Sequence, residues 1–220
     1  MITTPNQEDI QAGQSIYTQK SLLVYDLMVT RFSNRFVWQC PRKTLIDFFK
    51  EHTSINHLDI GVGTGYFLNQ LHLVPGKQRL GLLDMNKACL EHAKIKLNQF
   101  APEIYQYSIF EPFTSISKKF DSVSLNYVLH CLPGNVAQKA IGFDHIKAIL
   151  NQNGKIFGTT ILGKNVKHNG LATKLLTIYN NKKIMHNLND SCDELISELR
   201  KRFSKVDVKI RGCVALFVAG

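Results

Sequence analysis

The chain has 220 residues, a formal net charge of +10 and 44% hydrophobic residues. This length fits one domain, and the hydrophobic content is high enough for a packed core, which excludes a largely disordered chain. The apolar runs are far shorter than the ~20 residues that span a bilayer, and the polar start of the chain does not resemble a signal peptide. Its five cysteines form no CxxC pair, so we expect neither a disulfide framework nor a metal site. These features predict a soluble, cytoplasmic protein.

The excess of 27 basic over 17 acidic residues has two interpretations. A basic surface steers nucleic acid, anionic lipid or an acidic substrate toward a protein. A composition that is simply rich in lysine gives the same net charge without any such partner. The charge is concentrated, because no acidic residue occurs between Asp144 and Asp190, so we expect one side of the molecule to be positive.

Strand-like and helix-like segments alternate along the chain, which is typical of a parallel sheet with helices on both faces. Short, mostly apolar runs mark the expected strands, which are 57–60, 79–84, 103–109, 120–126, 155–161, 206–210 and 214–218. Apolar residues at helical spacing mark the expected helices, which are 10–36, 42–51, 66–73, 87–99, 135–150 and 193–203. Seven strands fit one doubly wound, mostly parallel α/β sheet that ends in a hairpin.

Local signals place several of these boundaries. Pro41 can open a helix, Asn86 is a suitable N-cap, and Asp190–Ser191 caps the last helix. Pro75–Gly76 breaks the segment that follows the first strand. Asn153–Gly154 is interpreted as a turn into the fifth strand.

The most informative stretch is a glycine-rich loop, HLDIGVGTG, which begins at His57 and follows the first strand. Gly61, Gly63 and Gly65 alternate, so the loop can adopt positive φ angles and bring a ligand close to bare backbone. A dinucleotide fingerprint reads GxGxxG and holds a pyrophosphate. Here the spacing is GxGxG and Asp59 precedes it, which would repel a pyrophosphate but suits a ligand with an ammonium or sulfonium charge.

A second acid, Asp84, ends the next strand. In a doubly wound fold, an acid at this place accepts hydrogen bonds from ribose hydroxyls. Met85 beside it can lie on the face of an adenine. The glycine loop alone is a weak signal, but the loop, the acid and the topology together predict a site for a positively charged nucleoside ligand.

These motifs resemble those of the class I S-adenosylmethionine-dependent methyltransferases, over about residues 40–220. LDIGVGTG is similar to the first motif of that family, LGLLDMN to its second, FDSVSLNYVLHCLP to the segment around the end of the fourth strand, and LNQNGKIFGTTIL to the entry into the fifth strand. The resemblance implies a Rossmann-like, seven-stranded sheet whose last strand is antiparallel. It also implies S-adenosylmethionine as the cofactor and a small molecule as the substrate.

The resemblance further implies which residues hold the cofactor. By position they are Asp59, Gly61, Val62, Gly63, Gly65, Asp84, Met85, Ser108, Ile109, Asn126 and Tyr127. Asp59 and the glycines would lie near the methionine part, and Asp84 would hold the ribose. Asn126 and Tyr127 would lie near the sulfonium. Ser108 would lie by the adenine, where the family commonly has an acid instead.

Segments outside the sheet are expected to cover the site. We expect an N-terminal helical cap over residues 1–40, a methyltransferase domain over 41–220, and within it a helical lid over 163–189. Tyr25 of the cap is a candidate for binding the cofactor carboxylate, with packing in the core as the alternative. The apolar residues of the lid favour an apolar or aromatic substrate, whereas its lysines suit an anionic one.

Methyl transfer needs little covalent help, because the sulfonium is already a strong electrophile. The protein has to hold the nucleophile in line with the methyl group and exclude water. A general base assists when the nucleophile carries a proton, and His130 is the candidate because an unperturbed histidine has a pKa near ~6.5. The alternative is that His130 only packs in an apolar turn.

We therefore expect methyl transfer to oxygen or nitrogen of a small, aromatic or lipid-like metabolite. The sequence from Asn126 lacks the (D/N)PP(Y/F) motif of enzymes that methylate amino groups of bases or glutamine, which disfavours nucleic acid without excluding it. One alternative is an RNA or protein methyltransferase that docks through the basic 147–183 surface. Another is a regulator that binds the cofactor and transfers nothing. The sequence makes no prediction of the oligomeric state.

Overall fold

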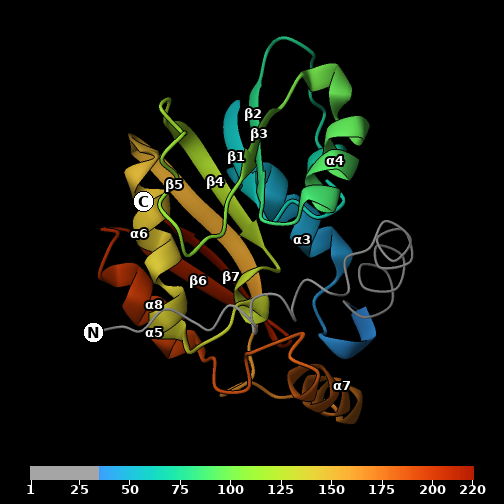
Figure 1. Cartoon of the computed structure of the whole chain (residues 1–220). Helices are drawn as coiled ribbons and strands as arrows, with labels where there is room; N and C mark the ends of the chain where they lie inside the picture. Colours follow the sequence, from blue (N-terminus) through green and yellow to red (C-terminus); the bar gives the residue numbers. More distant parts are fainter. Residues whose placement is uncertain (1–34) are drawn as a thin grey trace.

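A seven-stranded sheet forms the centre of the computed structural model, which describes residues 35–220 (Figure 1). The strand order is β3-β2-β1-β4-β5-β7-β6. The strands are β1 (Asn56–Ile60), β2 (Arg79–Asp84), β3 (Glu103–Gln106), β4 (Phe120–Asn126), β5 (Leu150–Ile161), β6 (Val206–Arg211) and β7 (Val214–Ala219). Strands β1 to β5 are parallel, and β7 is antiparallel to β5 and β6. The predicted doubly wound sheet with an antiparallel last strand is confirmed.

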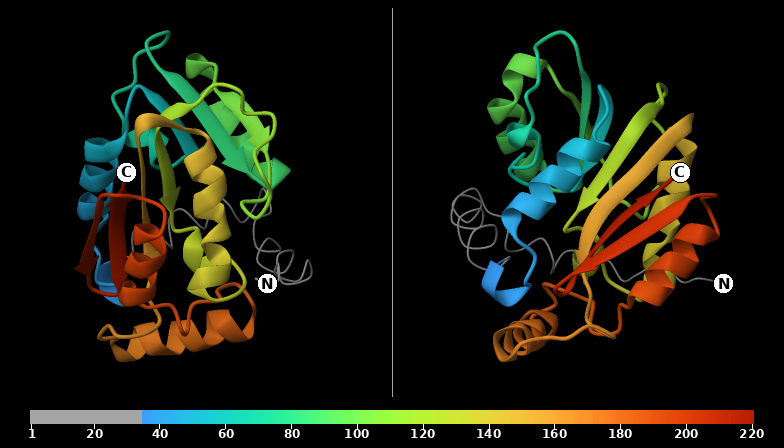
Figure 2. Two further views of the ribbon diagram at one scale, coloured as in Figure 1. Left: turned by 90° about the vertical axis from the view of Figure 1, so that its left-hand side faces the viewer. Right: turned by 180° about the vertical axis from the view of Figure 1, so that it is seen from behind.

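Helices cover both faces of this sheet (Figure 2). Those on one face are α3 (Arg42–His52) and α4 (Lys87–Lys96). Those on the other face are α5 (Val136–Lys139), α6 (Ile141–Ala148) and α8 (Cys192–Arg200). Helix α7 (Gly170–Asn181) lies beyond the end of β5, where its Leu176 packs in one cluster with Ile161 (Figure 1).

Strand β1 contributes to two separate cores because it is buried on both faces, as a central parallel strand should be. Leu58 and Ile60 pack into the cluster beneath α5, α6 and α8. His57 points to the opposite face, where its ring contacts Phe49 of α3 at 5.7 Å between centroids. Asp59 follows His57 by two residues and therefore lies on the same face.

The predicted helix caps are confirmed. Pro41 is the N-cap of α3. The side chain of Asn86 accepts the Ala88 N–H at the start of α4, at 2.9 Å. Ser191 forms a reciprocal capping box with Glu194 of α8.

The predicted helix over 66–73 is wrong. This segment forms turns and a three-residue 3-10 helix, η2 (Leu68–Gln70), and Leu71 is already extended. The Asn69 N–H bonds to the Gly65 carbonyl as in an α-helix, but the next two bonds along the chain span only three residues. Pro75 forces extended backbone before it, so too few residues remain for a stable α-helix.

Other element boundaries in the structure also differ from the predicted ones. Strand β3 ends at Gln106, three residues before its expected end. The helix expected over 135–150 is divided at Ala140 into α5 and α6. Asn153–Gly154 lies inside β5 rather than before it, because the pairing with β4 passes from Leu150 directly to Lys155 and leaves an irregularity between them.

The predicted cap and lid are described only in part. Of the cap over 1–40, the structure describes residues 35–40, so Tyr25 lies outside the described residues. Of the lid over 163–189, only α7 is helical. Within residues 35–220, no helix is long and apolar enough to cross a membrane, and no group of acids, histidines and cysteines could hold a metal ion.

Candidate active site

A cavity lies at the carboxyl ends of β1, β2 and β4, where open α/β sheets bind their ligands. Its walls are the glycine loop after β1, the end of β2 and the turns after β3 and β4. The predicted cofactor residues that line it are Gly61, Gly63, Asp84, Met85, Ser108, Ile109 and Tyr127. The fold therefore brings together residues that are up to 66 positions apart in the chain, from Gly61 to Tyr127.

The glycines of the loop are required for different reasons. All three have positive φ: +68° at Gly61, +52° at Gly63 and +68° at Gly65. A Cβ on Gly61 would lie 2.4 Å from Cγ2 of Val128, so this glycine lets the turn after β4 pack against the loop. A Cβ on Gly63 would meet no atom closer than 4.0 Å, so this glycine leaves backbone open to the cavity. Gly65 faces α4 instead and does not line the cavity.

Asp84 provides the only carboxylate among the described residues that line the cavity. One of its oxygens accepts the Gly63 N–H at 3.2 Å and the other accepts the Asn86 N–H at 2.9 Å. Burial raises the pKa of Asp84, and the N–H groups of Asn86 and Gly63 oppose this rise by stabilising the carboxylate. The carboxylate is thus held in place between the loop and the start of α4.

These residues fit an adenosyl ligand. The carboxylate of Asp84 accepts the N–H groups of Gly63 and Asn86 and has further acceptor capacity, as ribose hydroxyls would require. Met85, Ile109 and Phe110 supply an apolar setting for a purine. Ser108 lines the cavity beside them, and its hydroxyl oxygen accepts the Phe110 N–H at 3.3 Å.

Asp59 and Val62 lie behind the loop and do not line the cavity. The Asp59 side chain accepts the Ser124 hydroxyl of β4 and is 4% exposed. Burial raises the pKa of Asp59 to about 7, the Ser124 bond lowers it, and the charge of Asp84 raises it further. Val62 packs in the apolar cluster on the α4 face.

The two residues predicted beside the sulfonium differ in their exposure to the cavity. Tyr127 lines it, has a φ of +58°, and donates its N–H to the Thr159 carbonyl at 2.8 Å. Asn126 is buried and does not line the cavity. Its side-chain oxygen accepts the Thr159 hydroxyl at 3.2 Å, and its side-chain nitrogen has no hydrogen-bond partner.

Comparison with known proteins identifies the family. The family model described as "Methyltransferase domain" matches residues 58–156. The uncharacterized protein YbcY of Escherichia coli (strain K12) is 40% identical over 190 residues, which cover 85% of this chain and 96% of YbcY. The physcion biosynthesis cluster O-methyltransferase of Aspergillus chevalieri is 35% identical over 219 residues, 98% of this chain and 97% of that enzyme. The chain is a class I methyltransferase.

The cofactor of this methyltransferase is S-adenosylmethionine. A solved structure with the same fold, titled "DhpI-SAH complex structure", has a TM-score of 0.70 and 13% sequence identity. It covers 98% of this chain and is itself covered to 98%. The fold, the enzyme class and the cofactor predicted from the sequence are thereby confirmed.

His130 of the methyltransferase is turned away from the cavity. It is 2% exposed in the 3-10 helix η4 (Leu129–Cys131), and its Nδ1 accepts the Ile161 N–H of β5 at 3.4 Å. Burial lowers the pKa of His130 to about 3, and the positive charge of Lys139 lowers it further. The imidazole is therefore neutral at physiological pH, and its geometry favours the packing role over the role of a general base.

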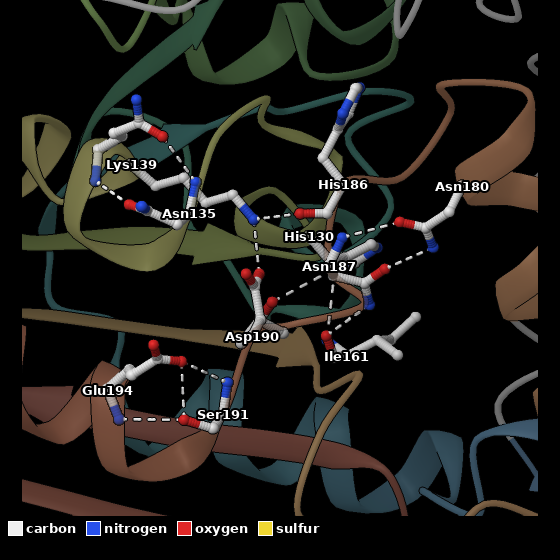
Figure 3. Close-up of polar contacts among 12 residues, drawn as sticks. His130, Asn135, Lys139, Ile161, Asn180, His186, Asn187, Asp190, Ser191 and Glu194 are labelled. Carbon is white, nitrogen blue, oxygen red and sulfur yellow. Dashed lines mark hydrogen bonds and ion pairs between the residues drawn. The ribbon is translucent and has the colours of Figure 1, made fainter. Parts of the chain in front are cut away.

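A buried ion pair is linked by hydrogen bonds to the turn after β4 (Figure 3). Lys139 of α5 lies 2.5 Å from Asp190 and donates a second hydrogen bond to the His186 carbonyl at 2.7 Å. The His186 N–H in turn bonds to the His130 carbonyl at 2.8 Å. The ion pair therefore connects the segment before α8 to the turn that carries Tyr127.

Several residues that line the cavity are not among the predicted cofactor contacts. They are Ile60, Leu83, Asn86, Cys89, Tyr107, Phe110, Val128, Cys131, Leu132 and Pro133. Two signals could have found part of this set. The first is the run Tyr107-Ser108-Ile109-Phe110, which contains the two predicted residues Ser108 and Ile109, and the second is the motif after β4, which extends to Pro133.

Proposed function

We propose that this methyltransferase transfers the methyl group of S-adenosylmethionine to an oxygen atom of a small, apolar or aromatic metabolite. The observation that carries the proposal is the cavity, in which one fixed carboxylate, Asp84, lies among mostly apolar side chains beside an open glycine loop. The relative from Aspergillus chevalieri supports an oxygen acceptor, because it is named an O-methyltransferase.

Bound S-adenosylmethionine supplies an activated methyl group on a sulfonium. In the proposed complex, Asp84 accepts hydrogen bonds from the ribose, and Met85 and Ile109 pack on the adenine. Gly61 and Gly63 leave room for the methionine part. Tyr25 remains a proposed contact of the cofactor carboxylate from outside the described residues.

The remaining task of the protein is to hold the acceptor oxygen in line with the methyl group and keep water out. Tyr127 reaches the cavity from the end of β4 and is the residue that we propose contacts the acceptor. We propose that His130 is a support of the turn and not the base. His130→Gln is then expected to keep kcat within about tenfold of the wild type, whereas general-base catalysis is worth 10²–10⁴-fold.

We also propose a small-molecule acceptor rather than a macromolecule. The exposed lysines of the 147–183 surface, Lys164, Lys167, Lys174, Lys182 and Lys183 among them, leave docking of RNA or protein as the alternative to test. A cytoplasmic location is part of the proposal, and the five free thiols fit a reducing compartment.

The test begins with calorimetric titration of S-adenosylmethionine into the purified protein. Methyl transfer from labelled cofactor is then measured with a panel of phenols, alcohols and amines, and with RNA and basic peptides as separate arms. Labelled phenol or alcohol is the expected product. Failure to bind the cofactor would refute the site, and binding without any transfer would favour the regulator. RNA methylation together with binding that weakens steeply with salt would favour the macromolecular alternative.

A further inference from the structure

A chain of hydrogen bonds runs through the sheet behind the glycine loop, from Asp59 to the segment before β1. Asp59 accepts the Ser124 hydroxyl, and Ser124 Oγ lies 3.1 Å from His57 Nε2. Nδ1 of His57 lies 2.8 Å from Ser122 Oγ. Ser122 Oγ accepts the Ser54 N–H at 2.9 Å and lies 2.8 Å from Ser54 Oγ. We call these five residues the Asp59 relay.

The central residues of the relay lie on one buried face of two paired strands. His57 pairs with Ser122 and Asp59 with Ser124, so four polar side chains point to the same face of β1 and β4. His57, Ser122 and Ser124 have no exposed surface. The His57 ring stacks on Phe157 at 5.7 Å. Leaving a polar group buried in this way without a hydrogen-bond partner is costly.

When Asp59 is ionised, one arrangement of protons satisfies the relay. The Ser124 hydroxyl donates to Asp59, so the Ser124 oxygen must receive its hydrogen bond from Nε2–H of His57. Nδ1 is then an acceptor and takes the Ser122 hydroxyl. The Ser122 oxygen accepts from Ser54 in turn.

When Asp59 is protonated on the oxygen that faces Ser124, the bonds between the side chains of the relay reverse, while the Ser54 N–H still donates to Ser122. The carboxylic acid donates to Ser124, and the Ser124 hydroxyl donates to Nε2 of His57. The imidazole now carries its proton on Nδ1 and donates to Ser122. Ser122 donates to Ser54, whose hydroxyl is within 2.8 Å of the Asn56 carbonyl and donates there.

One mixed arrangement is excluded. An ionised Asp59 combined with Nδ1–H would leave the lone pair of Nε2 facing the lone pairs of Ser124 at 3.1 Å, with no proton between them. An ionised Asp59 thus fixes the Nε2–H tautomer of His57, and protonation of the Asp59 oxygen that faces Ser124 allows the Nδ1–H tautomer. The change takes up one solvent proton and alters only O–H and N–H bonds.

We propose that His57 is a positioning residue of the cofactor site, which acts through Ser124 on Asp59 and changes tautomer when Asp59 gains or loses a proton. Burial lowers the pKa of His57 itself to about 3, so the ring switches between two neutral forms and does not become charged. Burial raises the pKa of Asp59 to about 7, which places the switch near neutral pH.

Few titratable groups act on this pair from the elements around it. From β2, the charge of Asp84 raises the pKa of Asp59. From α3, His52 contacts Phe157 at 5.7 Å between ring centroids, on the same aromatic cluster as His57. Burial, followed by the charge of Lys155, lowers the pKa of His52.

The consequence for the cofactor rests on the proposed function. An ionised Asp59 adds a second negative charge beside Asp84, behind the loop that is proposed to hold the cationic part of the cofactor. Binding of that cation and ionisation of Asp59 then favour each other, so binding below neutral pH releases a proton.

The first experiment uses the cofactor-free protein and ¹⁵N NMR of the His57 ring between about pH 5.5 and about pH 9. We expect Nε2–H at high pH and Nδ1–H at low pH, with one transition near pH 7. A single tautomer throughout, or formation of the imidazolium, would overturn the proposal. Ser124→Ala and Asp59→Asn each disconnect the switch, and in both the tautomer should no longer follow pH. Thr160→Val removes a buried hydroxyl elsewhere in the sheet and should leave the transition in place.

The second experiment measures binding of S-adenosylmethionine by calorimetry across the same pH range, in buffers of different ionisation enthalpy. The difference between the wild type and Asp59→Asn isolates the proton of Asp59 from that of the cofactor amino group. We expect up to about one additional proton released by the wild type below pH ~7. Equal release by both proteins would overturn the link between the relay and the cofactor. Absence of cofactor binding would instead refute the proposed function, while the tautomer result would stand.

Discussion

The buried pair of Lys139 and Asp190 gives the largest stability effect that we expect from a single substitution outside the cavity. The two side chains are 2% and 6% exposed, and Lys139→Met would leave Asp190 without its counter-charge while also removing the bond to the His186 carbonyl. Breaking a buried pair from one side costs about 3–5 kcal/mol. Lys43 and Asp47 form a pair of the same length, 2.5 Å, with 86% and 56% exposure. Lys43→Met is therefore the matched control, and we expect it to cost at most about 0.5 kcal/mol.

Urea unfolding at about pH 8 measures these values, and a double-mutant cycle with Asp190→Asn measures the coupling. Asp190→Asn should recover about 1–3 kcal/mol in the Lys139→Met background, because it removes the unpaired buried charge. Burial already raises the pKa of Asp190 against the pull of Lys139, and without Lys139 this pKa should rise further. A carboxyl with a raised pKa in the folded state favours folding more at lower pH, so the deficit should shrink on acidification. A loss below about 1 kcal/mol for Lys139→Met, or strict additivity in the cycle, would refute this reasoning.

Gly61→Ala should destabilise the protein by about 1–3 kcal/mol and weaken cofactor binding, because it combines a φ of +68° with a 2.4 Å contact to Val128. Unchanged urea unfolding and unchanged calorimetric affinity would contradict this. The buried histidines make folding less favourable in acid between about pH 6.5 and about pH 4, because His57 and His130 have pKa values of about 3 in the fold and each binds one more proton in the unfolded chain. The raised pKa values of Asp59, Asp84 and Asp190 act in the opposite direction. His130→Gln should therefore reduce the acid sensitivity of the free energy of unfolding by about 1.4 kcal/mol per pH unit, and an unchanged pH dependence in urea unfolding would show that the buried His130 is not neutral.

The central sheet could be predicted from the sequence because its strands are short apolar runs with clear ends. Strands β2 and β4 have their predicted bounds. Each ends at a polar residue, Asp84 or Asn126, at the side of the sheet where the carboxyl ends of the parallel strands meet. The segment over 66–73 was mispredicted because its apolar spacing resembles that of a helix, while the proline after it limits its length. The placement of Asn153–Gly154 inside β5 depends on how β5 pairs with β4, and no residue pattern within the segment indicates that pairing.

The site was predictable where a role depends on strand ends and not where it depends on side-chain direction. Gly61 and Asp84 line the cavity because the carboxyl ends of parallel strands meet at one edge. Asp59 is next to the loop in sequence, but its side chain turns into the sheet toward Ser124. His130 follows β4 closely, yet its ring turns toward β5. The partner that each side chain meets comes from a neighbouring strand, so the spacing within its own segment does not reveal it.

Binding of S-adenosylmethionine to the Asp84→Ala variant tests the central claim most directly. Loss of the carboxylate should weaken the cofactor by about 1–3 kcal/mol in calorimetric titration, which corresponds to an increase in Kd of roughly 5- to 150-fold. Glu91→Ala, which removes an exposed carboxylate from α4, should leave Kd unchanged, and thermal unfolding checks that both variants are folded. A folded Asp84→Ala protein with the wild-type Kd would contradict the assignment of this cavity to the cofactor.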